Sequence, residues 1–242
     1  MSDREADRYL VKEIFKTVQG EGFWSGRPAV FIRFVGCNMW SGYEKDRERD
    51  FNRNYAKTGG GECALWCDTD FTKQGAVKYT AVEIAAQARK IGHKVDFCVL
   101  TGGEPFLHID GFVVAALKRQ GFTVAVETNG TCSTNIFMHP GGLSPDWICC
   151  SPKVPEAHIK LEVCHELKLV LPSYSPSEYR TLIDRVLTVL AANQSKKPLY
   201  LQPCDWDAHT SKEMIAKLVM DTIEQNPQWS ISLQSHKILG VE

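Results

Sequence analysis

The stretch "CVLTGGEP" (residues 98–105) carries the clearest signal of a parallel-sheet strand and its terminal turn. A short apolar, β-rich run leads directly into two glycines and a glutamate. Such a run is typical of a strand that is covered on both faces of a parallel sheet. The glycines mark a tight turn at its carboxyl end, because glycine adopts backbone conformations that other residues avoid.

Similar runs occur along the rest of the chain. Predicted strands cover residues 29–35, 97–101, 123–127, 147–150, 166–171, 199–202 and 230–235. Helices between them are predicted from capping boxes at Thr80–Glu83 and Thr210–Glu213, and from Ser175 followed by Pro176. The helix after Thr210 should end before Pro227, because a proline disfavours helix in the preceding residue. This alternation predicts an α/β fold with a mainly parallel sheet and right-handed crossovers.

The composition is that of an ordinary globular protein of 242 residues, with 43% hydrophobic and 24% charged residues and a net charge of −1. It allows one substantial core or two small domains, and we predict a single domain over residues 1–242. The charge balance gives no electrostatic case for nucleic acid. The charged first residues and the lack of long apolar runs predict no secretory signal, no membrane span and a cytoplasmic location.

Unusual residues follow five of the predicted strands. They are Cys37, "TGGEP" (101–105), "TNG" (128–130), "SPK" (151–153) and "QPCD" (202–205). Ligands of parallel α/β sheets gather beyond the carboxyl ends of the strands, both in open sheets and in barrels. An active site is therefore predicted at this edge, while the pattern leaves open whether the sheet closes.

Three of the nine cysteines, Cys37, Cys63 and Cys67, lie near this edge. Structural zinc usually takes four ligands in paired spacings, but Cys37 has no paired neighbour and residues 37–71 contain no histidine. A [4Fe–4S] cluster on three cysteines leaves one iron open to another ligand. The alternative is packed thiols, which a polar, glycine-rich loop disfavours. Five further thiols are predicted to be core or inert: Cys98, Cys132, Cys149, Cys150 and Cys164.

A strand ending in "GCN" (36–38), then "WCDT" (66–69) and "TGGEP", resembles the radical S-adenosylmethionine (SAM) superfamily. Further motifs are similar to one family within it, the 7-carboxy-7-deazaguanine synthases of queuosine and 7-deazapurine biosynthesis. They are "TVQGEG" (17–22), "RPAVFIRFVGCN" (27–38), "WCDTDF" (66–71), "VETNG" (126–130), "WICCSPK" (147–153), "ELKLV" (166–170), "QP" (202–203) and "SHK" (235–237). The resemblance spans nearly the whole chain, with the motifs in order.

The resemblance implies a partial, modified (β/α) barrel with an insertion in the cluster loop at about residues 38–62. The insertion separates Cys37 from Cys63, and three residues separate Cys63 from Cys67, where the superfamily pattern has three and two. It implies a lyase that converts 6-carboxy-5,6,7,8-tetrahydropterin to 7-carboxy-7-deazaguanine. Hydrogen abstraction at C6, ring contraction and loss of ammonia complete the reaction, with SAM used catalytically. A homodimer and an electron donor such as a flavodoxin are also implied.

Site residues follow from the same resemblance, and none is assigned as a protein acid or base. The [4Fe–4S] ligands are Cys37, Cys63 and Cys67, and the magnesium ligand is Thr69. SAM contacts are Gly103, Glu104, Ser151, Pro152, Lys153, Gln202, Pro203, Cys204 and Asp205. Substrate contacts are Val18, Gln19, Gly20, Glu21, Arg33, Thr101, His236 and Glu242.

Plainer interpretations stand beside these roles. The glycine pair could form an ordinary turn, Thr69 could close a turn with Asp68, and Arg33 could face solvent from its strand. His236 could be structural or solvated. The mixed charges of residues 43–57 first predict a solvated loop, and the alternative is a segment that shields the cluster or docks the electron donor.

Two other classes of function compete with the synthase. A glycyl-radical activase would share the cysteines and "GGEP" but would not be expected to carry "TVQGEG". A zinc-binding interaction module would be colourless and would need neither "QGEG" nor "SPK". RNA binding lacks both a basic excess and stacking motifs. The ordered set of motifs favours the synthase.

Overall fold

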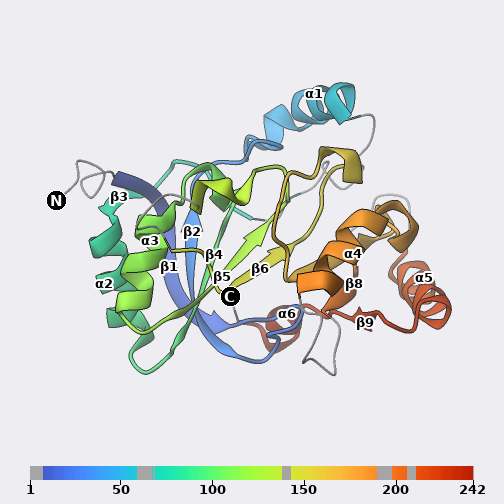
Figure 1. The fold of residues 1–242 in the computed structure, drawn as a ribbon. Coiled ribbons are helices and arrows are strands. Elements are labelled where there is room, and N and C mark those ends of the chain that lie inside the picture. Colours follow the sequence, from blue (N-terminus) through green and yellow to red (C-terminus); the bar gives the residue numbers. More distant parts are fainter. Residues whose placement is uncertain are drawn as a thin grey trace.

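The computed structural model describes residues 8–58, 67, 69–137, 143–189, 198–205 and 211–241. They form one open, nine-stranded sheet with the strand order β3-β1-β2-β4-β5-β6-β7-β8-β9 (Figure 1). Neighbouring strands are parallel along the order β2-β4-β5-β6-β7-β8-β9, whereas β1 is antiparallel to both β2 and β3. The predicted α/β fold with a mainly parallel, incompletely closed sheet is confirmed.

The strands are β1 (Arg8–Val18), β2 (Pro28–Phe34), β3 (Val77–Thr80), β4 (Phe97–Gly102), β5 (Thr123–Thr128), β6 (Trp147–Cys150), β7 (Glu166–Leu171), β8 (Leu199–Pro203) and β9 (Ser230–Ile231). The helices are α1 (Arg47–Thr58), α2 (Ala81–Gly92), α3 (Gly111–Arg119), α4 (Arg180–Val189), α5 (Lys212–Gln225) and α6 (Ser235–Leu239). Within the described ranges, none of these helices is both long and apolar enough to cross a membrane.

Helix starts and stops follow the predicted signals closely. Thr80 and Glu83 form the capping box of α2. The capping box predicted at Thr210–Glu213 is wrong by one residue, because Ser211 is the N-cap of α5 and its hydroxyl accepts the backbone N–H of Met214. That helix ends at Gln225, two residues before the proline, as predicted. The capping box at Ser175 is present, but it opens a short 3₁₀ turn that precedes α4.

Three sequence predictions differ from the structure. In the segment 230–235 only Ser230–Ile231 is strand, because α6 begins at Ser235. The strands β1 and β3 were not predicted, since the dense charges of β1 obscure its alternation. The solvated-loop prediction for residues 43–57 is wrong, because α1 begins at Arg47. Buried Asp50 accepts the backbone N–H of Ser41 and buried Asn54 donates to the Met39 carbonyl, so α1 is tied to the chain beyond Cys37.

The sheet buries one face under helices and leaves part of the other face polar. The helices α2 and α3 lie side by side against one face and form the main core with Ile32, Leu100 and Val126 (Figure 1). Alternate residues of the same strands point the other way. There, Phe97, Val99, Ala125, Trp147 and Cys149 form a smaller cluster with Phe31. The thiols predicted for the apolar strands, Cys98, Cys149 and Cys150, are buried as expected.

Candidate active site

A cavity of about 360 Å³ opens toward the carboxyl ends of the central strands. The strand period places Arg33, Thr101 and Glu127 on the polar continuation of one sheet face, and all three line the cavity. The predicted substrate and magnesium residues that line it are Val18, Gln19, Gly20, Glu21, Arg33, Thr69, Thr101 and His236. Glu242 lies outside the described residues. A volume of this order suits a small heterocyclic ligand.

An ion-pair network forms part of the cavity wall. Lys168 on β7 is 4% exposed, and its ammonium contacts a carboxylate oxygen of Glu21 and lies 3.2 Å from one of Glu127. The second oxygen of Glu21 accepts amide N–H groups from Gln202 at 3.1 Å and Gln234 at 2.8 Å. Burial acts to raise the pKa of Glu21, but Lys168, the hydrogen bond from Gln234 and the nearby His236 lower it to about 2. Glu21 is therefore an anion at neutral pH.

The segment from Gly20 to Gly22 is joined to residues more than two hundred positions later. The backbone N–H of Gly22 donates to the Ser232 hydroxyl at 2.9 Å, and the N–H of Ser235 donates to the Gly20 carbonyl at 2.9 Å. The ring of His236 occupies the space beside Gly20, where an added Cβ would lie 2.0 Å from its Nδ1. The cavity wall is thus built from both ends of the described chain.

Glu166, on the same strand as Lys168, fixes the loop that follows Glu21. Its carboxylate accepts the indole N–H of Trp147 at 2.7 Å and the backbone N–H of Phe23 at 3.0 Å. Burial, and then the nearby charge of Glu127, raise the pKa of Glu166 to about 7. Gly22 has a φ of +63°, and an added Cβ there would lie 1.8 Å from a Glu166 oxygen. Glycine is therefore required at this close approach.

The raised pKa of Glu166 predicts a pH-dependent stability. The folded protein holds a proton that the unfolded chain releases above about pH 4.5, so stability is lost as pH rises toward 7. Glu166→Gln, which cannot titrate, should flatten this loss by up to about 3 kcal/mol of unfolding free energy. Anaerobic thermal denaturation from pH 5 to 8 measures the slope for each protein. Equal slopes in both proteins would contradict the assignment. A lower midpoint for the variant at pH 5 would not contradict it, because glutamine keeps only one of the two acceptor oxygens.

Arg33 points into the cavity, so its plainer interpretation as a solvent-facing strand residue is wrong. Its side chain is 19% exposed and pairs with Glu13 at 2.5 Å, and its guanidinium lies 5.6 Å from the ring centre of Phe15. The register of β2 and β4 sets Arg33 beside Thr101. A guanidinium held in this way presents its remaining N–H groups to an anionic ligand.

The "TGGE" turn packs directly on the segment that carries Cys37. The backbone N–H of Glu104 donates to the Gly36 carbonyl at 3.0 Å. A Cβ added to Gly103 would lie 2.3 Å from that carbonyl oxygen and 2.6 Å from Cβ of Cys37. Only glycine allows this approach.

The Glu104 carboxylate is fully buried and joins two neighbouring turns. It accepts hydrogen bonds from the backbone N–H of Phe106 at 3.1 Å, the Thr128 hydroxyl at 2.8 Å and the backbone N–H of Asn129 at 2.7 Å. Burial raises the pKa of Glu104 to about 7 despite these donors. The turns after β4 and β5 are therefore held as one unit beside Cys37.

Two of the three predicted cluster ligands lie together. Cys37 and Cys67 are half-buried against a small apolar cluster of Met39, Trp40, Phe71 and Val154. The sulfur of Cys37 accepts the backbone N–H of Met39 at 3.4 Å, and burial raises the pKa of this thiol to about 12. Cys63 lies outside the described residues. Among the described residues, no three His, Cys, Asp or Glu side chains are grouped so that they could hold a metal ion.

The other predicted SAM residues fall at two strand ends. After β6, the Lys153 ammonium donates to the Ser151 hydroxyl at 3.0 Å beside buried Pro152. At the end of β8, Gln202 joins the Glu21 network rather than facing the cysteines. Pro203 ends β8, and the backbone N–H of Cys204 donates to the Leu171 carbonyl. Asp205 lies at the surface, in ion pairs with Lys212 at 3.4 Å and Lys237 at 3.1 Å.

Glu13, Glu127, Lys168 and Gln234 were not predicted as site residues. Glu127 and Lys168 lie within "VETNG" and "ELKLV", which were recognised only as motifs. A lysine in an otherwise apolar strand was the available signal, because a buried ammonium needs ionic partners. No sequence pattern identifies Glu13 or Gln234.

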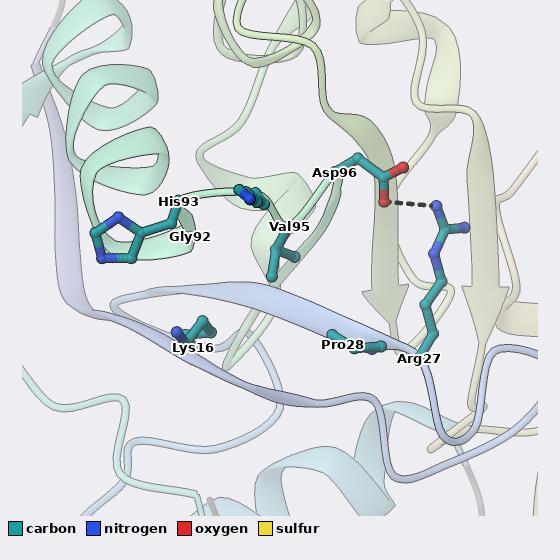
Figure 2. A pocket seen from close by; sticks show the side chains of 8 residues that line it. Lys16, Arg27, Pro28, Gly92, His93, Val95 and Asp96 are labelled. Carbon is teal, nitrogen blue, oxygen red and sulfur yellow. Dashed lines mark hydrogen bonds and ion pairs between the residues drawn. The ribbon is translucent and has the colours of Figure 1, made fainter.

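A second, more open cavity of about 760 Å³ lies at the opposite edge of the sheet. It is lined by Lys16, Arg27, Pro28, Gly92, His93, Lys94, Val95 and Asp96. Figure 2 shows Arg27 directed toward Asp96, and the ion pair measures 3.1 Å. None of the predicted site residues lines this cavity. This cavity lies at the amino-terminal ends of β2 and β4. That position also argues against a role as the main ligand site, because ligands of parallel sheets bind at the carboxyl ends.

Comparison with known proteins finds relatives that share one name and a similar fold. No known family model matches the chain. The chain is 39% identical to the 7-carboxy-7-deazaguanine synthases of Bordetella pertussis and Caulobacter vibrioides, and 38% identical to that of Burkholderia multivorans. Each comparison covers 96% of this chain and 99% of the relative. The crystal structure of QueE from Escherichia coli superposes with a TM-score of 0.60 at 22% identity, over 95% of this chain and 96% of that one.

Proposed function

The chain belongs to the 7-carboxy-7-deazaguanine synthase family, and on this premise we propose that it makes 7-carboxy-7-deazaguanine from 6-carboxy-5,6,7,8-tetrahydropterin in the strand-end cavity. The observation that carries the proposal is the composition of the cavity wall. Arg33, Glu21 and Thr101 line one volume, and Thr101 leads into the glycine turn that packs on the segment of Cys37. The overall step is a carbon–nitrogen lyase reaction in which ammonia is lost.

The cysteine segment fits a [4Fe–4S] cluster. Two thiols lie together in an apolar surrounding, and Cys37 already receives a backbone N–H bond of the kind that tunes cluster sulfurs. We propose Cys37, Cys63 and Cys67 as its ligands, with SAM bound at the open iron. When bound, the cluster and SAM supply the radical that takes hydrogen from C6 of the substrate. The close packing of Gly103 on Cys37 supports a SAM site along this turn.

The remaining SAM and magnesium assignments rest on the resemblance and on strand-end position. We propose that Glu104, through the turn that its buried carboxylate fixes, and the segment Ser151, Pro152 and Lys153 contribute to the SAM site, with Gln202, Pro203, Cys204 and Asp205 at its far side. Thr69 lines the same cavity as the substrate residues, and a hydroxyl is a ligand type that magnesium accepts together with substrate oxygens.

The protein's own groups orient the substrate. Arg33 binds the substrate carboxylate through its guanidinium, while Val18, Gln19, Gly20 and Glu21 meet the edge of the pterin. Glu21 is an anion, so it accepts hydrogen bonds from the ring N–H groups. His236 and Thr101 complete the wall, and we propose Glu242 as a further contact.

The test is product formation by the anaerobically reconstituted protein with the tetrahydropterin, SAM, magnesium and a reductant. Arg33→Gln should raise KM for the tetrahydropterin about 10- to 100-fold, because a bidentate charge-assisted pair is lost from a partly buried site. Iron content and SAM cleavage without substrate should stay at wild-type values. Lack of product from the wild-type protein would overturn the function, and an unchanged KM for Arg33→Gln would overturn the carboxylate assignment alone.

We further propose that the chain works in the cytoplasm as a homodimer and receives electrons from a flavodoxin-like donor. The position of α1 supports the donor, because this helix is tied to the segment beyond Cys37 through Asn54.

Two other classes of function predict different outcomes of reconstitution. A zinc-binding module would stay colourless, and an activase would cleave SAM without forming product from the pterin.

A further inference from the structure

We propose that Lys168 is a positioning residue for this reaction, which holds the carboxylates of Glu21 and Glu127 in place so that both accept hydrogen bonds from the pterin. The inference rests on the proposed function, because it assumes that a pterin occupies the cavity. Lys168 itself is not among the residues that line the cavity, so it acts through the two carboxylates.

The first support is the burial of Lys168. All six residues of β7 are buried, and Lys168 has 4% of its surface exposed. An ammonium in such a place requires ionic partners, and the described residues supply two, Glu21 and Glu127. One carboxylate comes from the loop after β1 and the other from β5. The lysine thus connects two chain segments that border the ligand space.

The second support is the geometry of the two carboxylates. Each has one oxygen on Lys168 and the other on a side-chain amide: Gln202 and Gln234 hold Glu21, and Gln19 holds Glu127 at 3.0 Å. All of these partners donate. A carboxylate has about four acceptor positions, so neither group is saturated by these contacts. The 2-amino and ring N–H groups of a pterin are donors of the kind that the remaining positions accept.

The third support is the charge around the network. Glu21, Glu127 and the buried Glu166 are three acidic groups, and Cys149 on β6 lies near the same lysine. His236 on α6 is a second basic group near Glu21. Without Lys168, two adjacent carboxylates facing one cavity would repel each other, and the pKa of Glu21 would rise because its burial would no longer be offset. A protonated carboxyl cannot accept from the pterin at both oxygens.

The experiment compares Lys168→Met, which removes the charge, with Lys168→Arg, which keeps it. Kinetics with the tetrahydropterin are measured from pH 6 to 9, together with iron content. Lys168→Met should raise KM about 100-fold at pH 7. Between pH 7 and pH 9 the KM of this variant should fall at least tenfold, as the carboxyl ionises again. Lys168→Arg should restore most of the affinity. Lys217→Met, at an exposed lysine on α5, is the matched control and should behave as wild type.

Three outcomes would overturn the inference. They are an unchanged KM for Lys168→Met, a KM raised equally at every pH, and an arginine variant no better than the methionine variant. If Lys168→Met does not fold, Glu127→Gln replaces it, because it removes the second carboxylate that Lys168 holds and keeps the shape of the side chain. That variant should show a raised KM with no recovery at high pH, and a wild-type KM would contradict the proposal. Inactivity of the wild-type protein would instead overturn the proposed function.

Discussion

Cys37→Ala is expected to yield a nearly colourless protein after anaerobic reconstitution, with bound iron falling from about four atoms per chain to near zero. Synthase activity should fall by more than about 100-fold, because changes even to groups behind a metal ligand cost 10- to 100-fold. The reason lies in the position of Cys37. It follows β2, its sulfur accepts a backbone N–H, and the glycine turn packs on its Cβ.

Cys132→Ala is the matched control for this experiment. Cys132 is also half-buried and near the same edge, but it lies beside the turn after β5 and outside the cluster loop. It should keep the colour, the iron and the activity. A brown Cys37→Ala protein with full iron would contradict the ligand assignment. A wild-type protein that binds one zinc and no iron would overturn the whole mechanism.

Gly103→Ala is expected to have the second largest effect, with a loss of about 100-fold in activity and much of the cluster. The added Cβ would lie 2.3 Å from the carbonyl oxygen of Gly36, a contact that a backbone cannot relieve cheaply. Either the turn or the Cys37 segment must move, and a displacement of about 1 Å near reacting groups can cost 100-fold. Iron content and SAM cleavage after reconstitution measure the damage.

Gly75→Ala separates this steric effect from backbone strain. Gly75 has a φ of +75°, but an added Cβ there would meet no atom within 4 Å. It should lose about 1 kcal/mol of stability and keep its cluster and activity. If Gly103→Ala matches Gly75→Ala in iron content and activity, the packing of the turn on Cys37 is not functional.

The sequence identifies the interior of the fold better than its edges. Strands such as β4 are covered on both faces, so their apolar runs and terminal glycines are visible without knowledge of neighbours. β1 carries four charged residues among its eleven, and its antiparallel partners supply information that no local pattern contains. The helix α1 was missed for a similar reason, because its packing depends on buried Asp50 and Asn54.

The site shows the same division. Motifs locate Glu21, Arg33 and Thr101, and the structure brings them to one cavity. The partners that set their charge come from elsewhere in the chain: Lys168 for Glu21, and Glu13 for Arg33. A pairing of this kind depends on strand order and register, which a single sequence does not contain.

The hydrogen bonds between Gly22 and Ser232, and between Gly20 and Ser235, also bear on how the protein is made. These partners are separated by more than two hundred residues, and translation proceeds at about 5–20 residues per second. Residues 20–22 are therefore synthesised at least about ten seconds before residues 232–235, their partners in the cavity wall. A nascent or prematurely terminated chain without residues 232–236 lacks the hydrogen bonds that close this part of the cavity wall. We expect the complete cavity to form only in chains whose synthesis has passed that point.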